Sequence, residues 1–177
     1  MGRMIMTRGL IDEDFVNYRL PAMTVMFPRC SFKCGREACQ NAAMEGLPII
    51  MADAGGLAER YANNPITKAV VFQGLEPFDT PEDMFGLLES IRERTDDPVV
   101  IYTGYTREEV TDSGWLERLA KHRNVIVKYG RYVPGEDPHY DEVLGVALAS
   151  GNQYAREEGL PDKEGEEGNG DDDDGRN

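Results

Sequence analysis

The three cysteines of this chain all lie within ten residues, and their spacing is the first feature with a chemical consequence. Cys30, Cys34 and Cys39 form the pattern Cys-x3-Cys-x4-Cys. Cysteines that only fill a core are usually scattered, whereas three in one short loop are typical of ligands for a soft metal centre. An odd number does not suit a disulfide framework. Three thiolates suit an iron–sulfur cluster that leaves one iron open, while structural zinc normally needs a fourth ligand. Zinc and ordinary thiols remain the alternatives.

The cysteines follow a short apolar segment that predicts a buried strand. This segment, residues 22–27, ends at Pro28, so the cysteine loop leaves the carboxyl end of an early strand. α/β folds place their functional residues at such strand ends. The loop is therefore in a position where a site is expected.

Three more apolar runs predict strands, and helical patterns separate them. The runs are Lys68–Phe72, Val99–Tyr102 and Asn124–Val127. Strands that alternate with helices at this spacing indicate βαβ units, hence an α/β fold with a mainly parallel sheet. The loops that follow the four strands should then meet at one edge of the sheet. These loops begin after Phe27, Phe72, Tyr102 and Val127.

Helix starts are marked by local signals in two places. Thr80 followed by Pro81 predicts an N-cap and a first helical residue, and Thr106 with Glu109 predicts a capping box. Residues 54–63 have a helical composition, and Gly114 is expected to interrupt the helix that starts after Thr106. Residues 1–19 are expected to be an irregular lead-in.

Composition limits the classes of partner. The net charge is −14, and ten acidic but only two basic residues lie between Glu157 and Asn177. We therefore expect one domain over residues 1–156 and an acidic, disordered tail over 157–177. Nucleic-acid binding is not expected, because phosphate contacts need clustered Lys and Arg. No apolar run approaches the roughly 18 residues of a membrane span, and no signal-peptide pattern is visible, so we expect a cytoplasmic protein without membrane contact.

Several motifs in one order resemble the radical S-adenosylmethionine (radical SAM) superfamily, over about residues 14–153. The chain is most similar to the small activating proteins of anaerobic ribonucleotide reductase. The cysteine loop resembles that family's Cys-x3-Cys-x2-Cys motif, with the third cysteine two residues later. Residues 73–77 (QGLEP) resemble its Gly-Gly-Glu-Pro segment, and residues 102–106 (YTGYT) match its Tyr-Thr-Gly-Tyr-Thr segment.

The resemblance implies a site and its cofactors. Cys30, Cys34 and Cys39 would hold a 4Fe–4S cluster whose fourth iron binds SAM. Further cofactor-binding residues would come from the cysteine loop and from two strand ends. These residues are Phe32, Gln73, Gly74, Glu76, Tyr102 and Thr103. No protein acid or base is expected to be essential, because the cofactors carry the difficult chemistry.

The resemblance also implies an activity and a fold. One electron from a flavodoxin or ferredoxin would cleave SAM to a 5′-deoxyadenosyl radical, which would generate a glycyl radical on a partner enzyme, an anaerobic ribonucleotide reductase. The chain is too short for a full eight-unit barrel, so a partial (β/α) barrel with an open side is expected. The alternatives are a radical SAM enzyme with another peptide or substrate, and a non-catalytic α/β module that binds a metal.

Three basic side chains are not expected to take part in the site. Lys128 occupies the place of an Asp in the related proteins and is interpreted as a solvated charge at the rim. His122 lies between Lys121 and Arg123 and should be at the surface, and His139 follows Pro138 in a loop without an evident partner.

Overall fold

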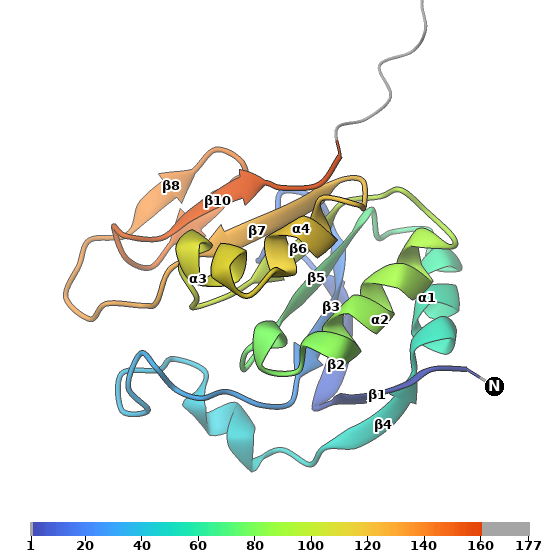
Figure 1. Ribbon diagram of the computed structural model, residues 1–177, viewed down its shortest axis with the longest axis horizontal. Helices are drawn as coiled ribbons and strands as arrows, with labels where there is room; N and C mark the ends of the chain where they lie inside the picture. Colours follow the sequence, from blue (N-terminus) through green and yellow to red (C-terminus); the bar gives the residue numbers. More distant parts are fainter. Residues whose placement is uncertain (1, 161–177) are drawn as a thin grey trace, which may run out of the picture.

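The computed structural model describes residues 2–160, and a six-stranded sheet forms its centre (Figure 1). The strand order is β10-β7-β6-β5-β3-β2. The strands are β2 (Gly9–Asp14), β3 (Ala22–Phe27), β5 (Ala69–Gly74), β6 (Val99–Tyr102), β7 (Val125–Tyr129) and β10 (Tyr154–Glu157). The four inner strands are parallel, and β2 and β10 pair antiparallel at the two edges. The predicted α/β class with a mainly parallel sheet is confirmed.

The sheet is open, with β2 at one edge and β10 at the other. The partial barrel expected from the sequence is therefore not confirmed. The register aligns Phe27 with Gly74 across the β3–β5 pair and Tyr102 with Lys128 across the β6–β7 pair. The carboxyl ends of the parallel strands thus meet at one edge of the sheet, as the sequence predicted.

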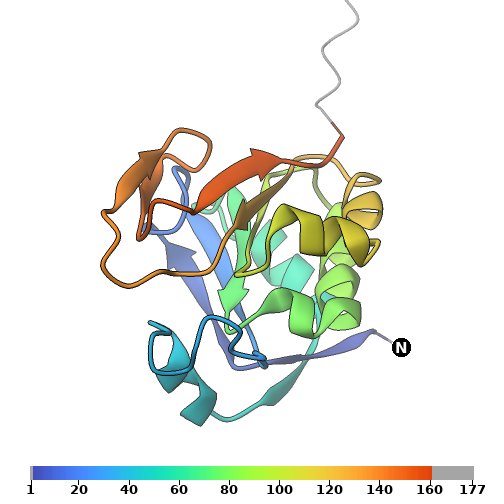
Figure 2. The same cartoon turned by 60° about the vertical axis from the view of Figure 1, so that its left-hand side comes forward.

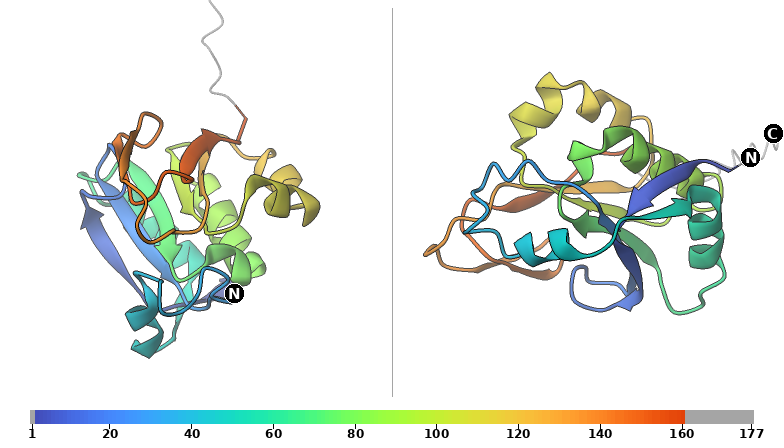
Figure 3. Two further views of the ribbon diagram at one scale, coloured as in Figure 1. Left: turned by 90° about the vertical axis from the view of Figure 1, so that its left-hand side faces the viewer. Right: turned by 90° about the horizontal axis from the view of Figure 1, so that it is seen from below.

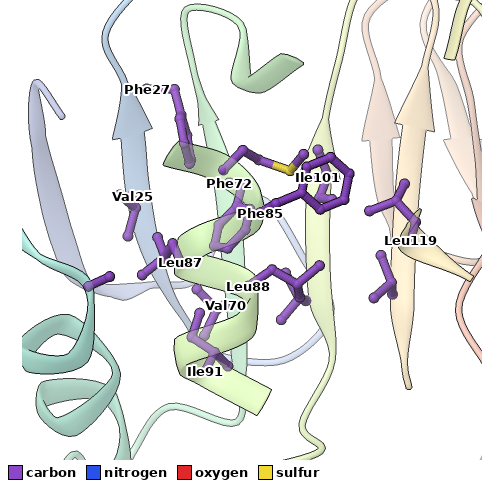
Figure 4. Packing of buried hydrophobic residues seen from close by; sticks show 14 of the residues in the cluster. Val25, Phe27, Val70, Phe72, Phe85, Leu87, Leu88, Ile91, Ile101 and Leu119 are labelled. Atoms are coloured by element: carbon purple, nitrogen blue, oxygen red, sulfur yellow. The ribbon is translucent and has the colours of Figure 1, made fainter. Parts of the chain in front are cut away.

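Four helices lie on one face of the sheet (Figures 1 and 3). They are α1 (Ala54–Ala62), α2 (Pro81–Arg92), α3 (Arg107–Asp112) and α4 (Trp115–Leu119). Leu87, Leu88 and Ile91 of α2 are fully buried and pack with Phe27 and Phe72 of the sheet (Figure 4). The longest described helix has 12 residues, and none of the described helices has the length and apolarity needed to cross a membrane.

The opposite face is covered by the chain between β7 and β10. This segment contains the hairpin of β8 (His139–Asp141) and β9 (Val146–Leu148). Its Leu144 and Leu148 pack with Val71, Val100 and Ile126, which point away from the helices. The inner strands are therefore buried on both faces, which explains why they read as continuous apolar runs.

The two predicted helix caps have different outcomes. Thr106 accepts a hydrogen bond from the amide of Glu109, and the Glu109 carboxylate accepts one from the amide of Thr106, so the capping box is confirmed. Thr80 does precede the first residue of α2, but its side chain makes no capping bond. Its hydroxyl is buried and has no hydrogen-bond partner within residues 2–160. Gly114 separates α3 from α4, as predicted, with φ 74°.

The prediction of an irregular lead-in was wrong. Residues 4–14 form β1 (Met4–Thr7) and β2, and β1 pairs antiparallel with β4 (Ile50–Asp53) in a separate two-stranded ribbon. Two short 3₁₀ turns, η1 (Ala42–Gly46) and η2 (Pro77–Asp79), complete the elements. Most of the predicted acidic tail, residues 161–177, lies outside the described residues, while β10 continues through Glu157.

Candidate functional site

A cavity of about 370 Å³ lies where the parallel strands end. The cysteine loop and the segment between β7 and β10 approach this end of the sheet from two sides (Figure 2). Every site residue that the sequence suggested lines this cavity except Phe32. Those that line it are Cys30, Cys34, Cys39, Gln73, Gly74, Glu76, Tyr102 and Thr103. The tertiary structure thus brings together residues that lie more than 70 positions apart in the chain.

The cysteine loop is built from successive tight turns. The amides of Gly35 and Ala38 donate to the carbonyls of Phe32 and Gly35, respectively. Phe32 has a positive φ of 51°, and its amide donates to the Cys30 sulfur at 3.2 Å. The Phe32 ring lies against the Arg36 guanidinium, 4.3 Å from ring centre to Cζ. Phe32 therefore supports the loop through its backbone and does not reach the cavity.

Polar contacts fix the loop to the helical side of the molecule. The Asp79 carboxylate accepts hydrogen bonds from the Ser31 amide and from the Tyr105 hydroxyl. The Lys33 ammonium lies 4.3 Å from the centre of the Tyr105 ring and 3.7 Å from the Glu109 carboxylate. Glu109 also pairs with Arg131 at 2.8 Å. The Tyr105 in the YTGYT motif thus positions the cysteine loop.

The three thiols are free and partly exposed. Burial, together with the nearby carboxylates of Glu76 and Asp79, raises the pKa of the Cys30 thiol to about 11, although the hydrogen bond from the Phe32 amide lowers it. Burial and the neighbouring Cys39 raise the pKa of Cys34. Without a metal, the Cys30 and Cys34 thiols are therefore protonated near neutral pH, and a bound cation would be needed to hold them as thiolates.

Glu76 is a buried carboxylate that accepts three hydrogen bonds within the protein. The Phe78 amide and the Thr103 hydroxyl donate to one oxygen at 3.1 and 2.8 Å, and the Gly104 amide donates to the other at 2.9 Å. Burial raises the pKa of Glu76 to about 7, although these hydrogen bonds lower it. Thr103 and Gly104 thus contribute to the site by holding Glu76 in the cavity wall.

Gly74 and Tyr102 shape the cavity through their backbone and ring. Gly74 has φ 103°, and a Cβ atom there would lie 2.9 Å from the Cα of Met26. Only glycine allows β5 to end this close to β3. The Tyr102 hydroxyl donates to the Asn17 carbonyl at 2.6 Å, which ties the β2–β3 loop to the cavity wall.

Lys128 was misinterpreted as a solvated rim charge. It is only 7% exposed and lines the cavity at the end of β7. All five residues of β7 are buried, so a lysine between Val127 and Tyr129 in this apolar strand was the signal for an inward position. Sequence reasoning also missed Asn17, Arg131 and Gln153, which line the cavity from loops.

The two histidines do not line the cavity. His122 is half-buried rather than at the surface, and burial lowers its pKa. His139 is half-buried in β8, and its Nδ1 has no hydrogen-bond partner among the residues that the structure describes. Neither histidine is therefore among the residues that line the cavity with the three cysteines.

The donor set of the cavity fits an iron–sulfur cluster better than a single ion. Within residues 2–160, no three His, Cys, Asp or Glu side chains form a group that could hold one metal ion. In a 4Fe–4S cluster each thiolate binds a different iron, so three thiolates leave one iron open. The three free thiols of the chain line one cavity of about 370 Å³, and their type and number fit such a cluster.

Comparison with protein families identifies one match. A family model described as a 4Fe-4S single cluster domain matches residues 19–145, which include the cysteine loop and all four parallel strands. Comparisons with curated proteins and with solved structures gave no match. The family match covers most of the chain.

Proposed function

The chain belongs to the family of 4Fe-4S single cluster domains, and from this membership we propose that it is a radical SAM protein. In this proposal Cys30, Cys34 and Cys39 hold the cluster, and SAM occupies the rest of the cavity. The observation that supports it most strongly is that the three thiols share one cavity with the QGLEP and YTGYT segments. The cavity combines ligands for a cluster with polar groups for a second molecule.

Cys30, Cys34 and Cys39 would hold the cluster, which would supply the electron for reductive cleavage of the sulfonium S–C5′ bond of SAM. In this proposal the residues of the chain bind and orient SAM. Glu76 presents a carboxylate toward the cavity, and a carboxylate is the natural partner of the SAM ammonium group. Thr103 and the Gly104 amide fix the orientation of that carboxylate.

A protein partner is the proposed substrate because exposed apolar side chains lie at the rim of the cavity. Phe15 and Val16, in the β2–β3 loop, are 64% and 75% exposed, and Val16 lines the cavity. An exposed apolar rim beside a site suits a large partner that excludes water. The proposed partner is a glycyl-radical enzyme of the anaerobic ribonucleotide reductase type, with a flavodoxin or ferredoxin as electron donor.

The test is anaerobic reconstitution with iron and sulfide, followed by reduction and an assay for 5′-deoxyadenosine. The wild-type protein should bind about four irons per chain and form 5′-deoxyadenosine, and Cys39→Ala should lose the product. Glu37→Ala, an exposed residue of the same loop, is the matched control and should keep it.

Two other results would redirect the proposal. Product formation without complex formation or a radical on a glycyl-radical partner would indicate a radical SAM enzyme with a different peptide or substrate. A protein that holds a cluster or zinc but leaves SAM intact would refute the proposal and indicate a metal-binding module without this activity.

A further inference from the structure

Lys128 is a buried cation in the cavity wall. Its side chain enters from the carboxyl end of β7 and is nine-tenths buried. The ammonium donates one hydrogen bond, to the Gly130 carbonyl at 2.9 Å. It makes no ion pair with any residue in the described part of the chain. Two of its three N–H donors are therefore available to a molecule in the cavity.

The other cation of the cavity wall is already paired. Arg131 donates to both oxygens of Glu109 at 2.8 Å, so its charge is balanced within the protein. The Tyr102 ring centre lies 5.9 Å from the Lys128 ammonium and balances little of its charge. A buried ammonium without a partner is costly, and this cost is relieved when a ligand brings an anion.

The charge around Lys128 limits the kind of anion. Glu76 lines the same cavity and acts on Lys128 as an opposite charge, although the two side chains make no ion pair within residues 2–160. A doubly charged phosphate would meet this carboxylate as well as the single ammonium. A carboxylate carries one charge and accepts two hydrogen bonds, which matches the two unused donors of Lys128.

We propose that Lys128 is the anion-binding residue of this cavity and receives a carboxylate of the ligand. The carboxylate can come from the methionyl end of SAM or from a second substrate. Only the SAM alternative rests on the proposed function. With Glu76 on β5 and Lys128 on β7, the cavity then presents one anion and one cation to a ligand that carries both charges.

Calorimetry on the anaerobically reconstituted protein tests this inference with two pairs of probes. The first pair is SAM and its carboxamide analogue, and the second is N-acetylglycine and N-acetylglycinamide. Lys128→Met removes the charge and keeps a similar length, Lys128→Arg keeps the charge, and Lys68→Met removes an exposed lysine at the other end of the sheet as the control. A charged hydrogen bond of this kind is worth about a 10- to 100-fold change in affinity.

Two results support the inference and identify the source of the carboxylate. Weaker binding of SAM, but not of its carboxamide, by Lys128→Met assigns the methionyl carboxylate. Unchanged SAM binding together with lost binding of N-acetylglycine assigns the second substrate. Lys128→Arg should recover part of the lost affinity in either case.

The inference is overturned if Lys128→Met and Lys68→Met bind every probe alike, or if the wild type does not distinguish either carboxylate from its amide. Thermal melting checks that each variant is folded. Lys128→Gln, which keeps a donor for Gly130, replaces the Met variant if that one does not fold. A protein that does not bind SAM refutes the proposed function, yet the N-acetylglycine pair still decides the role of Lys128.

Discussion

Replacement of Gly74 by alanine should strongly destabilise the fold, because Gly74 ends β5 against the neighbouring strand. Its φ of 103° is unfavourable for a residue with a side chain, which costs roughly 1–2 kcal/mol. A Cβ atom would also lie 2.9 Å from the Met26 Cα and 3.0 Å from the Phe27 nitrogen, and both are backbone atoms that cannot rotate away. Displacing the end of β3 adds about 1–3 kcal/mol. The total loss in free energy of unfolding should be about 2–5 kcal/mol.

Gly135→Ala is the matched control for the cost of a positive φ in a residue with a side chain. Gly135 also has a positive φ, 84°, but no atom lies within 4 Å of the position of its Cβ. Only the conformational cost of roughly 1–2 kcal/mol should apply there. Urea unfolding of the cluster-free wild type and both variants measures the difference. If the two alanine variants lose equal stability, the close approach of β5 and β3 does not have the energetic role argued here.

Three further results follow from single contacts. Thr106→Val should lower the free energy of unfolding by about 1 kcal/mol, because it breaks the capping box. Thr80→Val should leave the free energy of unfolding unchanged or raise it slightly, because it removes a buried hydroxyl that has no partner in the described chain. Equal losses in thermal melts would contradict this distinction. Glu76 should make the wild type less stable as pH rises from 4.5 to 7, because its folded pKa of about 7 exceeds the reference value of 4.5 and the folded state therefore holds the proton longer. This dependence, about 3 kcal/mol in total, should be absent in cluster-free Glu76→Gln, and an identical pH profile for the two proteins would refute it.

Local patterns in the sequence predicted most of the central fold. The inner strands were predictable because burial on both faces requires continuous apolar runs, and the capping box at Thr106 was predictable because its hydrogen bonds join residues three positions apart. The lead-in was missed because β1 pairs with β4, more than 40 residues away, and such pairing leaves little local signal. Thr80 has the right residue type for a cap, but its side chain does not reach the helix amides.

The sequence by itself determined which chemical groups are present: three thiols in one loop, a QGLEP segment, a YTGYT segment and an α/β order of elements that places them at one edge. Only the tertiary structure decided how these groups meet. It placed Phe32 against Arg36 rather than in the cavity, turned Lys128 inward, and buried Glu76 among three donors. The physical reason is that residue type and spacing fix local conformation, whereas burial and charge environment depend on packing between segments that lie far apart in the chain.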